Sequence, residues 1–330
     1  MRSSRLALLV LVTALLPRTA RAQQQEQGYA LDRLYLSAPG GQWFVMDALD
    51  LHGGLGGAMS LTTSYAHDPM RVRTTDGSER LTVVSGEALA DFGFAATYDR
   101  FRLYINLDVP LDVTGNSGVV GNYQFCAPNA NQPFTPSGVN PSTTTDAFAD
   151  GRIGVDARIL GRPGDAFRLG AGAQLFIPSP NTFTSEYITD GTFRAMGRAL
   201  VAGDIGRFSY AGQLGAHLRP RDDAPAPGPQ GSELLFGVAA GSRFAVGDAG
   251  KLALVVGPEI WGESAFRSLF GQNTTGVEGL MTGRVEGTAN SGPQVRVKLG
   301  LGAGLDQRFG APQWRLVLAV ELFDRSDRSR

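Results

Sequence analysis

The charged residues of this chain stand in a pattern that could bind or guide anions. From Phe101 to Leu111 the apolar residues share one parity, while Arg102 and Asp108 share the other. Successive side chains of a strand point to opposite faces, so such a segment has one apolar face and one charged face. Thirteen basic residues fall on the charged parity of their segments: Arg102, Arg152, Arg158, Arg168, Arg194, Arg198, Arg207, Arg219, Arg243, Arg284, Arg296, Lys298 and Arg315. Fewer acids share it: Glu87, Asp91, Asp108, Asp156, Glu233, Glu259 and Glu321. A wall with more guanidinium groups than carboxylates raises the local concentration of anions.

Residue types that perform catalysis are scarce. None of the histidines, His52, His67 and His217, has a serine two residues away on the same strand face, where it would activate a nucleophile. His67 and Asp68 could form the acid–base pair of a protease at an outer loop. However, the surrounding segment ends in Pro69 and is typical of a strand that breaks into a turn. We therefore expect that the protein is not an enzyme. A lipid-modifying enzyme is kept as a third hypothesis, after the two that are given at the end of this subsection.

The chain offers no pattern for a cofactor or a metal. Gly300, Gly302 and Gly304 resemble part of a nucleotide fingerprint, but no helix follows them and their neighbours alternate as in a strand. No histidine, cysteine and carboxylate group has the spacing of metal ligands. The single cysteine, Cys126, lies among Pro and Asn residues that indicate a loop, and it excludes a disulfide within the chain. We expect no cofactor and no metal.

Strands are required to place the charged residues on one face, and the alternation predicts about twelve of them. The predicted connections alternate in length. The long ones are 66–80, 112–149, 178–192, 220–231 and 262–276, and the short ones include 99–100, 161–165, 203–206 and 245–250. The last two connections, 286–293 and 305–311, break this rule mildly, and the strand near Val277 to Val285 has a weaker pattern. Long outer loops, short periplasmic turns, an even strand number and two periplasmic termini are typical of bacterial outer-membrane barrels.

The N-terminus has the features of an export signal. Arg2 and Arg5 precede an apolar run from Leu6 to Leu16, and a small-x-small cleavage site ends at Ala22. This run is shorter than the ~20 residues of a transmembrane helix, and no later stretch is longer. Removing this segment takes away four arginines and no acid, which changes the net charge from −1 to −5. Such a balance argues against nucleic acid as a partner.

The sequence therefore predicts an all-β protein, a closed antiparallel transmembrane β-barrel of about twelve strands in the cell outer membrane. Aromatic residues on the lipid parity, such as Tyr98, Phe101 and Trp314, fall at the strand ends, as in an interfacial girdle. A secreted soluble β-sandwich or propeller would explain the alternation but not the girdle. The predicted divisions are a signal peptide (1–22), a periplasmic lead-in or plug segment (23–49), the barrel (50–323) and a polar tail (324–330).

Short motifs resemble a known family. They are Gly41 to Leu51, Tyr65 to Pro69, Gly257 to Gly262, and the glycine-rich stretch from Gly302 to Pro312. These segments resemble the amino-terminal β-barrel of OmpA-family, porin-like outer-membrane proteins of myxobacteria and related deltaproteobacteria. The resemblance implies a barrel in the outer membrane without catalytic residues. Members often continue into a domain that binds peptidoglycan, but we expect no wall anchoring in this chain.

The favoured hypothesis is a porin-like channel for passive passage of small solutes with a weak anion preference. Candidate pore-lining residues are Arg102, Asp108, Arg152, Asp156, Arg158, Arg168, Arg194, Arg198, Arg243, Glu259, Arg296 and Lys298. The alternative is a structural or surface-interaction barrel whose charged groups pair across strands and close the lumen, with the 112–149 loop as its contact surface. A variant of the first hypothesis is a channel for apolar substrates with 23–49 as plug. Expected partners are outer-membrane lipids, the barrel-insertion machinery and small anionic solutes, while the oligomeric state stays open.

Overall fold

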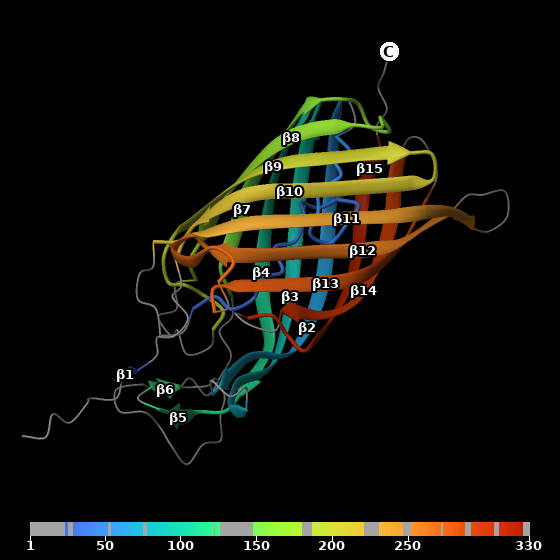
Figure 1. Ribbon diagram of the computed structural model, residues 1–330. Helices are drawn as coiled ribbons and strands as arrows, with labels where there is room; N and C mark the ends of the chain where they lie inside the picture. The colour runs from blue at the N-terminus through green and yellow to red at the C-terminus, as the bar shows by residue number, and fades with distance from the viewer. Residues whose placement is uncertain are drawn as a thin grey trace, which may run out of the picture.

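The protein is a closed barrel of twelve antiparallel strands (Figure 1), which confirms the predicted fold class. The computed structural model describes residues 24–25, 29–51, 54–74, 78–121, 123–125, 148–179, 187–220, 231–246, 252–271, 273–287, 292–306 and 310–325. The barrel strands are β2 (Leu55–Arg73), β3 (Glu79–Tyr98), β4 (Phe101–Gly115), β7 (Gly151–Leu160), β8 (Arg168–Ile177), β9 (Arg194–Ile205), β10 (Phe208–Leu218), β11 (Glu233–Val246), β12 (Leu252–Ala265), β13 (Thr275–Gly287), β14 (Gly292–Asp306) and β15 (Trp314–Arg325). A small separate sheet contains β1 (Gln24–Gln25), β5 (Gly118–Val120) and β6 (Tyr123–Phe125), and a 3-10 helix, η3, spans Phe266–Ser268.

Each barrel strand pairs with its sequence neighbour, and the last strand closes the ring on the first. Trp314 of β15 lies opposite His67 of β2, and this pairing continues to Phe323 opposite Ala58. Closure gives every strand two partners, so no edge of the sheet is left unpaired. Within the described residues, no helix is long and apolar enough to cross a membrane.

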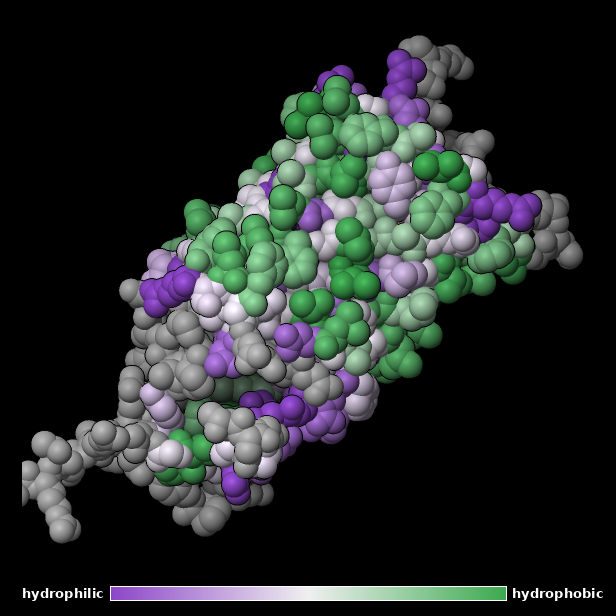
Figure 2. All heavy atoms as spheres, in the orientation of Figure 1, coloured by the Kyte–Doolittle hydropathy of each residue, from purple (hydrophilic) through white to green (hydrophobic). Residues whose placement is uncertain are grey.

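The alternation of the sequence separates the two faces of the wall. Leu103, Val238 and Leu299 point outward and are 58%, 61% and 54% exposed, whereas their strand neighbours Arg102 and Lys298 are 3% exposed in the interior. Figure 2 shows hydrophobic side chains gathered over the middle of the visible face, with hydrophilic residues toward the two ends. An apolar band of this kind is the surface that a barrel presents to lipid.

The two ends of the barrel differ in their connections. At the turn end, short connections such as 99–100 and 206–207 join the strands, and at the loop end the connections include 116–150 and 178–193. The loop predicted at 66–80 is mostly strand, because β2 and β3 extend to Arg73 and from Glu79. Apolar residues in these extensions pack against a buried cluster at the loop end, which keeps the hairpin paired. Cys126, the predicted signal peptide (1–22) and the last five residues lie outside the described residues.

A segment without regular secondary structure, residues 29–51, fills the barrel interior, and we call it the plug. Near the loop end, the Leu31 amide donates to the Tyr187 carbonyl at 2.8 Å. Near the turn end, the Arg158 guanidinium donates to the Leu51 carbonyl at 2.5 Å. The plug therefore runs the length of the lumen before β2 begins, as the blue segment inside the barrel of Figure 1 shows.

The two described ends of the chain lie at opposite ends of the barrel. Gln24 of β1 pairs with Tyr123 of β6 at the loop end, while the C-terminus leaves the turn end (Figure 1). This differs from the expectation of two termini on one side. The plug explains the difference. Twelve strands alone would start and end on the same side of the membrane, but the plug crosses the lumen once more before the first strand and so moves the N-terminal end to the other side.

Candidate functional site

One buried carboxylate holds the centre of the plug. Glu259 of β12 is fully buried and accepts hydrogen bonds from the backbone amides of Phe44 and Val45, both at 2.9 Å. The Thr282 hydroxyl of β13 donates to the same carboxylate at 2.7 Å. Hydrogen bonds to an ionised acceptor are about twice as strong as neutral ones. Glu259, a predicted pore-lining residue, is thus the main anchor for plug amides.

Basic side chains of the wall hold the plug carbonyls. The plug is not part of a sheet, so its buried carbonyls need partners outside regular structure. The contacts are Arg152 to Leu36 (2.8 Å), Arg296 to Gly40 and Gly41 (both 2.9 Å), Arg284 to Gln42 (3.0 Å), Lys298 to Trp43 (3.2 Å) and Arg168 to Ala48 (3.0 Å). These cations bind a polypeptide in the described structure.

Glycines on the interior face receive the large side chains of the plug. A Cβ atom at Gly241 would lie 2.7 Å from the Trp43 ring. A Cβ atom at Gly170 would lie 2.7 Å from the Leu49 side chain, and one at Gly300 would lie 2.6 Å from Leu280 of the wall and 3.0 Å from the Phe44 ring. Real Cβ atoms essentially never approach so closely. The wall is therefore shaped around this plug, and Gly300 has a packing role in place of a nucleotide-binding one.

The structure places all twelve candidate pore-lining residues on the interior face. Arg102 forms an ion pair with Asp47 of the plug. Other ion pairs lie within the wall and its connections: Arg102 with Asp156 (2.8 Å), Arg198 with Asp156 (3.1 Å), Arg168 with Asp204 (2.7 Å), Arg194 with Asp150 (2.7 Å), Arg243 with Glu286 (2.7 Å), and Lys298 with Glu321 (2.8 Å). Asp108 borders an interior cavity. Arg207 is exposed in the turn between β9 and β10, so its predicted interior position is wrong.

Three interior acids were missed by the parity argument. Glu263, Glu278 and Glu286 are at most 3% exposed and face the lumen from β12 and β13. The sequence prediction placed Glu263 and Glu286 in connections and treated the strand around Glu278 as weak, because both strands end later than expected. With these acids and with Asp47 of the plug, the interior is less basic than predicted.

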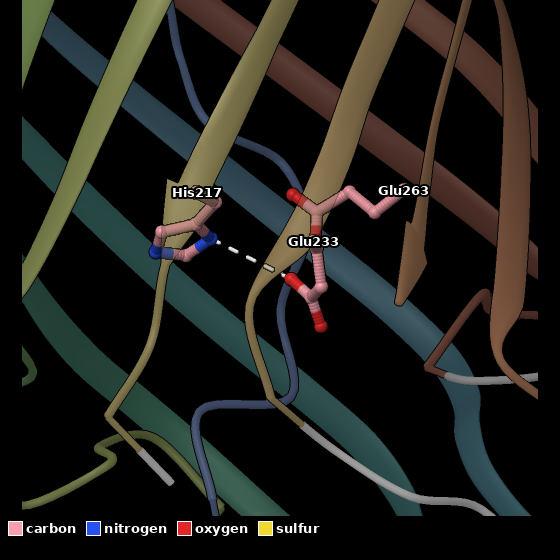
Figure 3. Close-up of side chains that lie close together, drawn as sticks. All are labelled: His217, Glu233 and Glu263. Carbon is pink, nitrogen blue, oxygen red and sulfur yellow. Dashed lines mark ion pairs between the residues drawn. The ribbon is translucent and has the colours of Figure 1, made fainter. Parts of the chain in front are cut away.

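Charged side chains form a dense cluster at the loop end of the lumen. His217, Glu233 and Glu263 are buried and converge there (Figure 3), with His217 Nδ1 at 3.5 Å from Glu233. Arg33 of the plug bridges the two glutamates, at 3.2 Å from Glu233 and 3.3 Å from Glu263. The parity argument had placed Glu233 on the charged face, but nothing in the sequence indicated that His217 and Glu263 would lie beside it.

Asp190 ties this cluster to the connection between β8 and β9. Its carboxylate accepts hydrogen bonds from Arg219 at 2.6 Å and from the Ala30 amide of the plug at 2.9 Å. Burial alone would raise the pKa of Asp190, but the guanidinium groups of Arg219 and Arg194 outweigh burial and hold the pKa below its ordinary value. Asp190 is therefore an anion that binds the wall and the plug together.

An acidic cavity of about 60 Å³ lies beside the plug near the loop end. Its lining includes Asp32, Glu87, Asp91, Asp108 and Asp150. Neither carboxylate oxygen of Glu87 has a hydrogen-bond partner among the described residues. The cavity has room for a few water molecules, which are the usual partners of such groups.

Comparisons with known proteins agree with the barrel fold. No protein-family model and no curated protein matches the chain. Among solved structures, an outer membrane channel from Pseudomonas putida F1 matches with a TM-score of 0.52 and 13% identity, over 83% of this chain and 98% of that chain. The NanC porin matches with a TM-score of 0.44 and 5% identity, over 80% and 98%. The toluene transporter TbuX of Ralstonia pickettii matches with a TM-score of 0.40 and 10% identity, over 92% and 96%.

The fold and the lumen together define a class. The chain has the fold of the bacterial outer-membrane β-barrels, and its own N-terminal segment occupies the lumen. The likeness to solved structures, at these identities, shows the fold alone.

Proposed function

We propose that this protein is an outer-membrane channel for small solutes that its own plug keeps closed. The observation that carries the proposal is the way in which the plug is bound. Hydrogen bonds between the plug backbone and wall side chains, among them Glu259 and Arg296, hold the plug inside a charged wall. Water can solvate such a wall once the plug leaves, whereas an apolar lumen would resist opening.

The apolar outer face supports a position in the outer membrane. Long connections face the cell exterior in such barrels and short turns face the periplasm, so the loop end is the outer end. The lipids of the membrane would contact the exposed band that includes Leu103 and Leu299. The barrel from Pseudomonas putida is described as an outer membrane channel, which agrees with this proposal.

A weak anion preference would arise in the half of the lumen nearest the periplasm. Many interior basic side chains lie in the turn-end halves of their strands: Arg102, Arg158, Arg168, Arg243, Arg284, Arg296 and Lys298. The wall acids in the same halves are fewer: Asp91, Asp156, Asp204, Glu286 and Glu321. Other interior acids lie in the opposite halves: Glu87, Glu233, Glu259, Glu263 and Glu278. Once the plug has moved, an anion in the lumen would thus be attracted by the basic side chains of the turn-end half.

Conductance in a planar lipid bilayer tests the proposal. We expect the full chain to show rare, brief openings and a variant that lacks residues 29–47 to conduct steadily, with reversal potentials in a salt gradient that indicate anions. Circular dichroism and heat-modifiable migration in gels would verify that both barrels are folded. A folded deletion variant that never conducts would contradict the channel and favour the second candidate, a structural barrel, which the filled lumen also supports.

The plug crossing predicts that the described N-terminal end lies at the cell surface. In a Cys126→Ser background, Gln24→Cys should react on intact cells with a maleimide that is too large to pass the outer membrane. The matched control, Asp324→Cys at the turn end, should react only after permeabilisation, because it faces the periplasm. Reaction at both positions or at the control alone would contradict this arrangement.

A further inference from the structure

The Arg33–Glu233–Glu263 contact places a plug cation in a pocket that the wall itself builds. His217 of β10 lies directly opposite Glu233 of β11, and Glu263 of β12 pairs with Leu235, two residues further along β11. Three adjacent strands therefore fix the imidazole and both carboxylates, independently of the plug. Figure 3 shows the three side chains turned toward one another.

The three wall side chains make a ligand set for zinc. An imidazole with two carboxylates, completed by water, matches the nitrogen and oxygen ligands that Zn²⁺ takes in open sites. Ligand atoms of His217, Glu233 and Glu263 lie within 4.8 Å of one another. Two ligands bound to one tetrahedral zinc are roughly 3.4 Å apart, given bonds of about 2.0–2.2 Å. The distance of 3.5 Å between His217 Nδ1 and Glu233 agrees with that geometry.

Part of the bonding capacity of this cluster is unused. Both carboxylate oxygens of Glu263 are buried, and neither has a hydrogen-bond partner among the described residues. His217 turns Nδ1 toward the glutamates (Figure 3). Glu263 also forms an ion pair with Arg33 of the plug, at 3.3 Å. Buried polar groups normally have partners, so these two oxygens are available to coordinate an ion.

Arg33 and a metal ion cannot occupy the cluster together. The Arg33 guanidinium lies between the two carboxylates and also donates to the Tyr35 hydroxyl at 3.2 Å. A divalent ion at the ligand distance from both carboxylates would overlap this position and repel the guanidinium. Arg219, which binds Glu233 at 2.9 Å from outside the pair, can stay.

We propose that His217, Glu233 and Glu263 form a binding site for a divalent transition-metal ion such as Zn²⁺, and that Arg33 of the plug is its built-in competitor. Metal binding displaces Arg33 and releases the loop-end part of the plug. The metal site stands on the cluster alone, whereas its effect on conduction rests on the channel function proposed above. Imidazole selects zinc over calcium and magnesium, whose preferred ligands are oxygens.

Titration calorimetry of the full, untagged chain in detergent micelles tests the site, with Cys126→Ser in every variant. We expect Arg33→Gln to bind Zn²⁺ at least tenfold more tightly than the parent chain, and Ca²⁺ to give no heat in either. Adding His217→Ala to Arg33→Gln should remove the binding. The matched control is His67→Ala, which removes an exposed histidine at 3.6 Å from Asp68 and should leave the affinity unchanged.

Two results would overturn the metal site: unchanged zinc affinity in Arg33→Gln, or zinc binding that survives His217→Ala. If the His217 variant does not fold, zinc-edge X-ray absorption of Arg33→Gln decides, because a site without an imidazole nitrogen contradicts the proposal.

A cysteine probe separates this inference from the channel function. Leu31 is fully buried in the plug at the loop end, so Leu31→Cys should react slowly with a soluble maleimide and at least tenfold faster with Zn²⁺. Faster labelling without any conductance would contradict only the channel. If the protein conducts but zinc changes neither the conductance nor the labelling rate, only the proposal that metal binding releases the plug is contradicted.

Discussion

Replacing Glu259 by glutamine should loosen the middle of the plug by about 3 kcal/mol, because a buried, charge-assisted acceptor loses its charge. The Glu259 carboxylate accepts hydrogen bonds from the backbone amides of Phe44 and Val45 and from the hydroxyl of Thr282. The amide group of glutamine keeps one acceptor oxygen and turns an NH₂ group toward donors. At least one of the two plug amides is then left buried without a partner.

Hydrogen exchange measured by mass spectrometry would report this change at the plug amides themselves. A loss of ~3 kcal/mol corresponds to roughly 100-fold faster exchange at Phe44 and Val45, if they exchange through release of the plug. Peptides from β8 should exchange as before, since the wall does not depend on the plug for its ladder. The open probability in bilayers should rise with the exchange rate.

Thr282→Val is the matched control for Glu259→Gln. It removes one hydrogen bond to Glu259 and leaves the two plug amides bound, so we expect a loss of about 1 kcal/mol. Equal effects of the two variants would mean that the carboxylate does not anchor the plug through its amides.

Replacing Trp43 by alanine should weaken plug binding by ~3–5 kcal/mol, the range for removing a large buried aromatic side chain. Trp43 is fully buried, and the Arg284 guanidinium lies 4.8 Å from the centre of its ring. Gly241 has no side chain to fill the space that the ring would leave, so we expect a cavity there. We expect exchange of the plug amides to accelerate by roughly two to four orders of magnitude.

Trp314→Ala provides the control for Trp43→Ala. Trp314 is 41% exposed on the outer face and packs against Tyr65 with ring centres 5.1 Å apart. Its removal should change the plug amides little, because it contacts the wall from the lipid side. If the plug amides exchange as slowly in Trp43→Ala as in Trp314→Ala, apolar packing contributes little to plug binding.

The barrel was predictable because its signal is local. A strand alternates its faces at every residue, so Arg102 and Leu103 already indicate an interior and an exterior face without any knowledge of the partners. The even strand number and the outward Leu103 agree with the structure. The ends of the strands were less predictable, as Glu263 and Glu286 show, because pairing with a neighbour can extend a strand beyond its apolar residues.

The plug was much less predictable because nothing local fixes its conformation. Lys298 binds the Gly41 carbonyl across 257 positions of sequence, and Glu259 reaches the Phe44 amide across 215. The segment around Trp43 has no period that would indicate a face. Its signal lay in the wall, where Gly241 and Gly300 leave space on the interior parity that only another part of the chain could fill.

The sequence by itself determined a twelve-stranded barrel and the interior position of its charged residues, since both follow from a period of two along each strand. Only the tertiary structure decided what those charges do. Arg296 could have faced water, an anion or an acid on the next strand, and in the fold it binds the plug at Gly40 and Gly41. Partner choice inside a closed lumen depends on which segments distant in sequence enter it, and alternation within a strand carries no information about that.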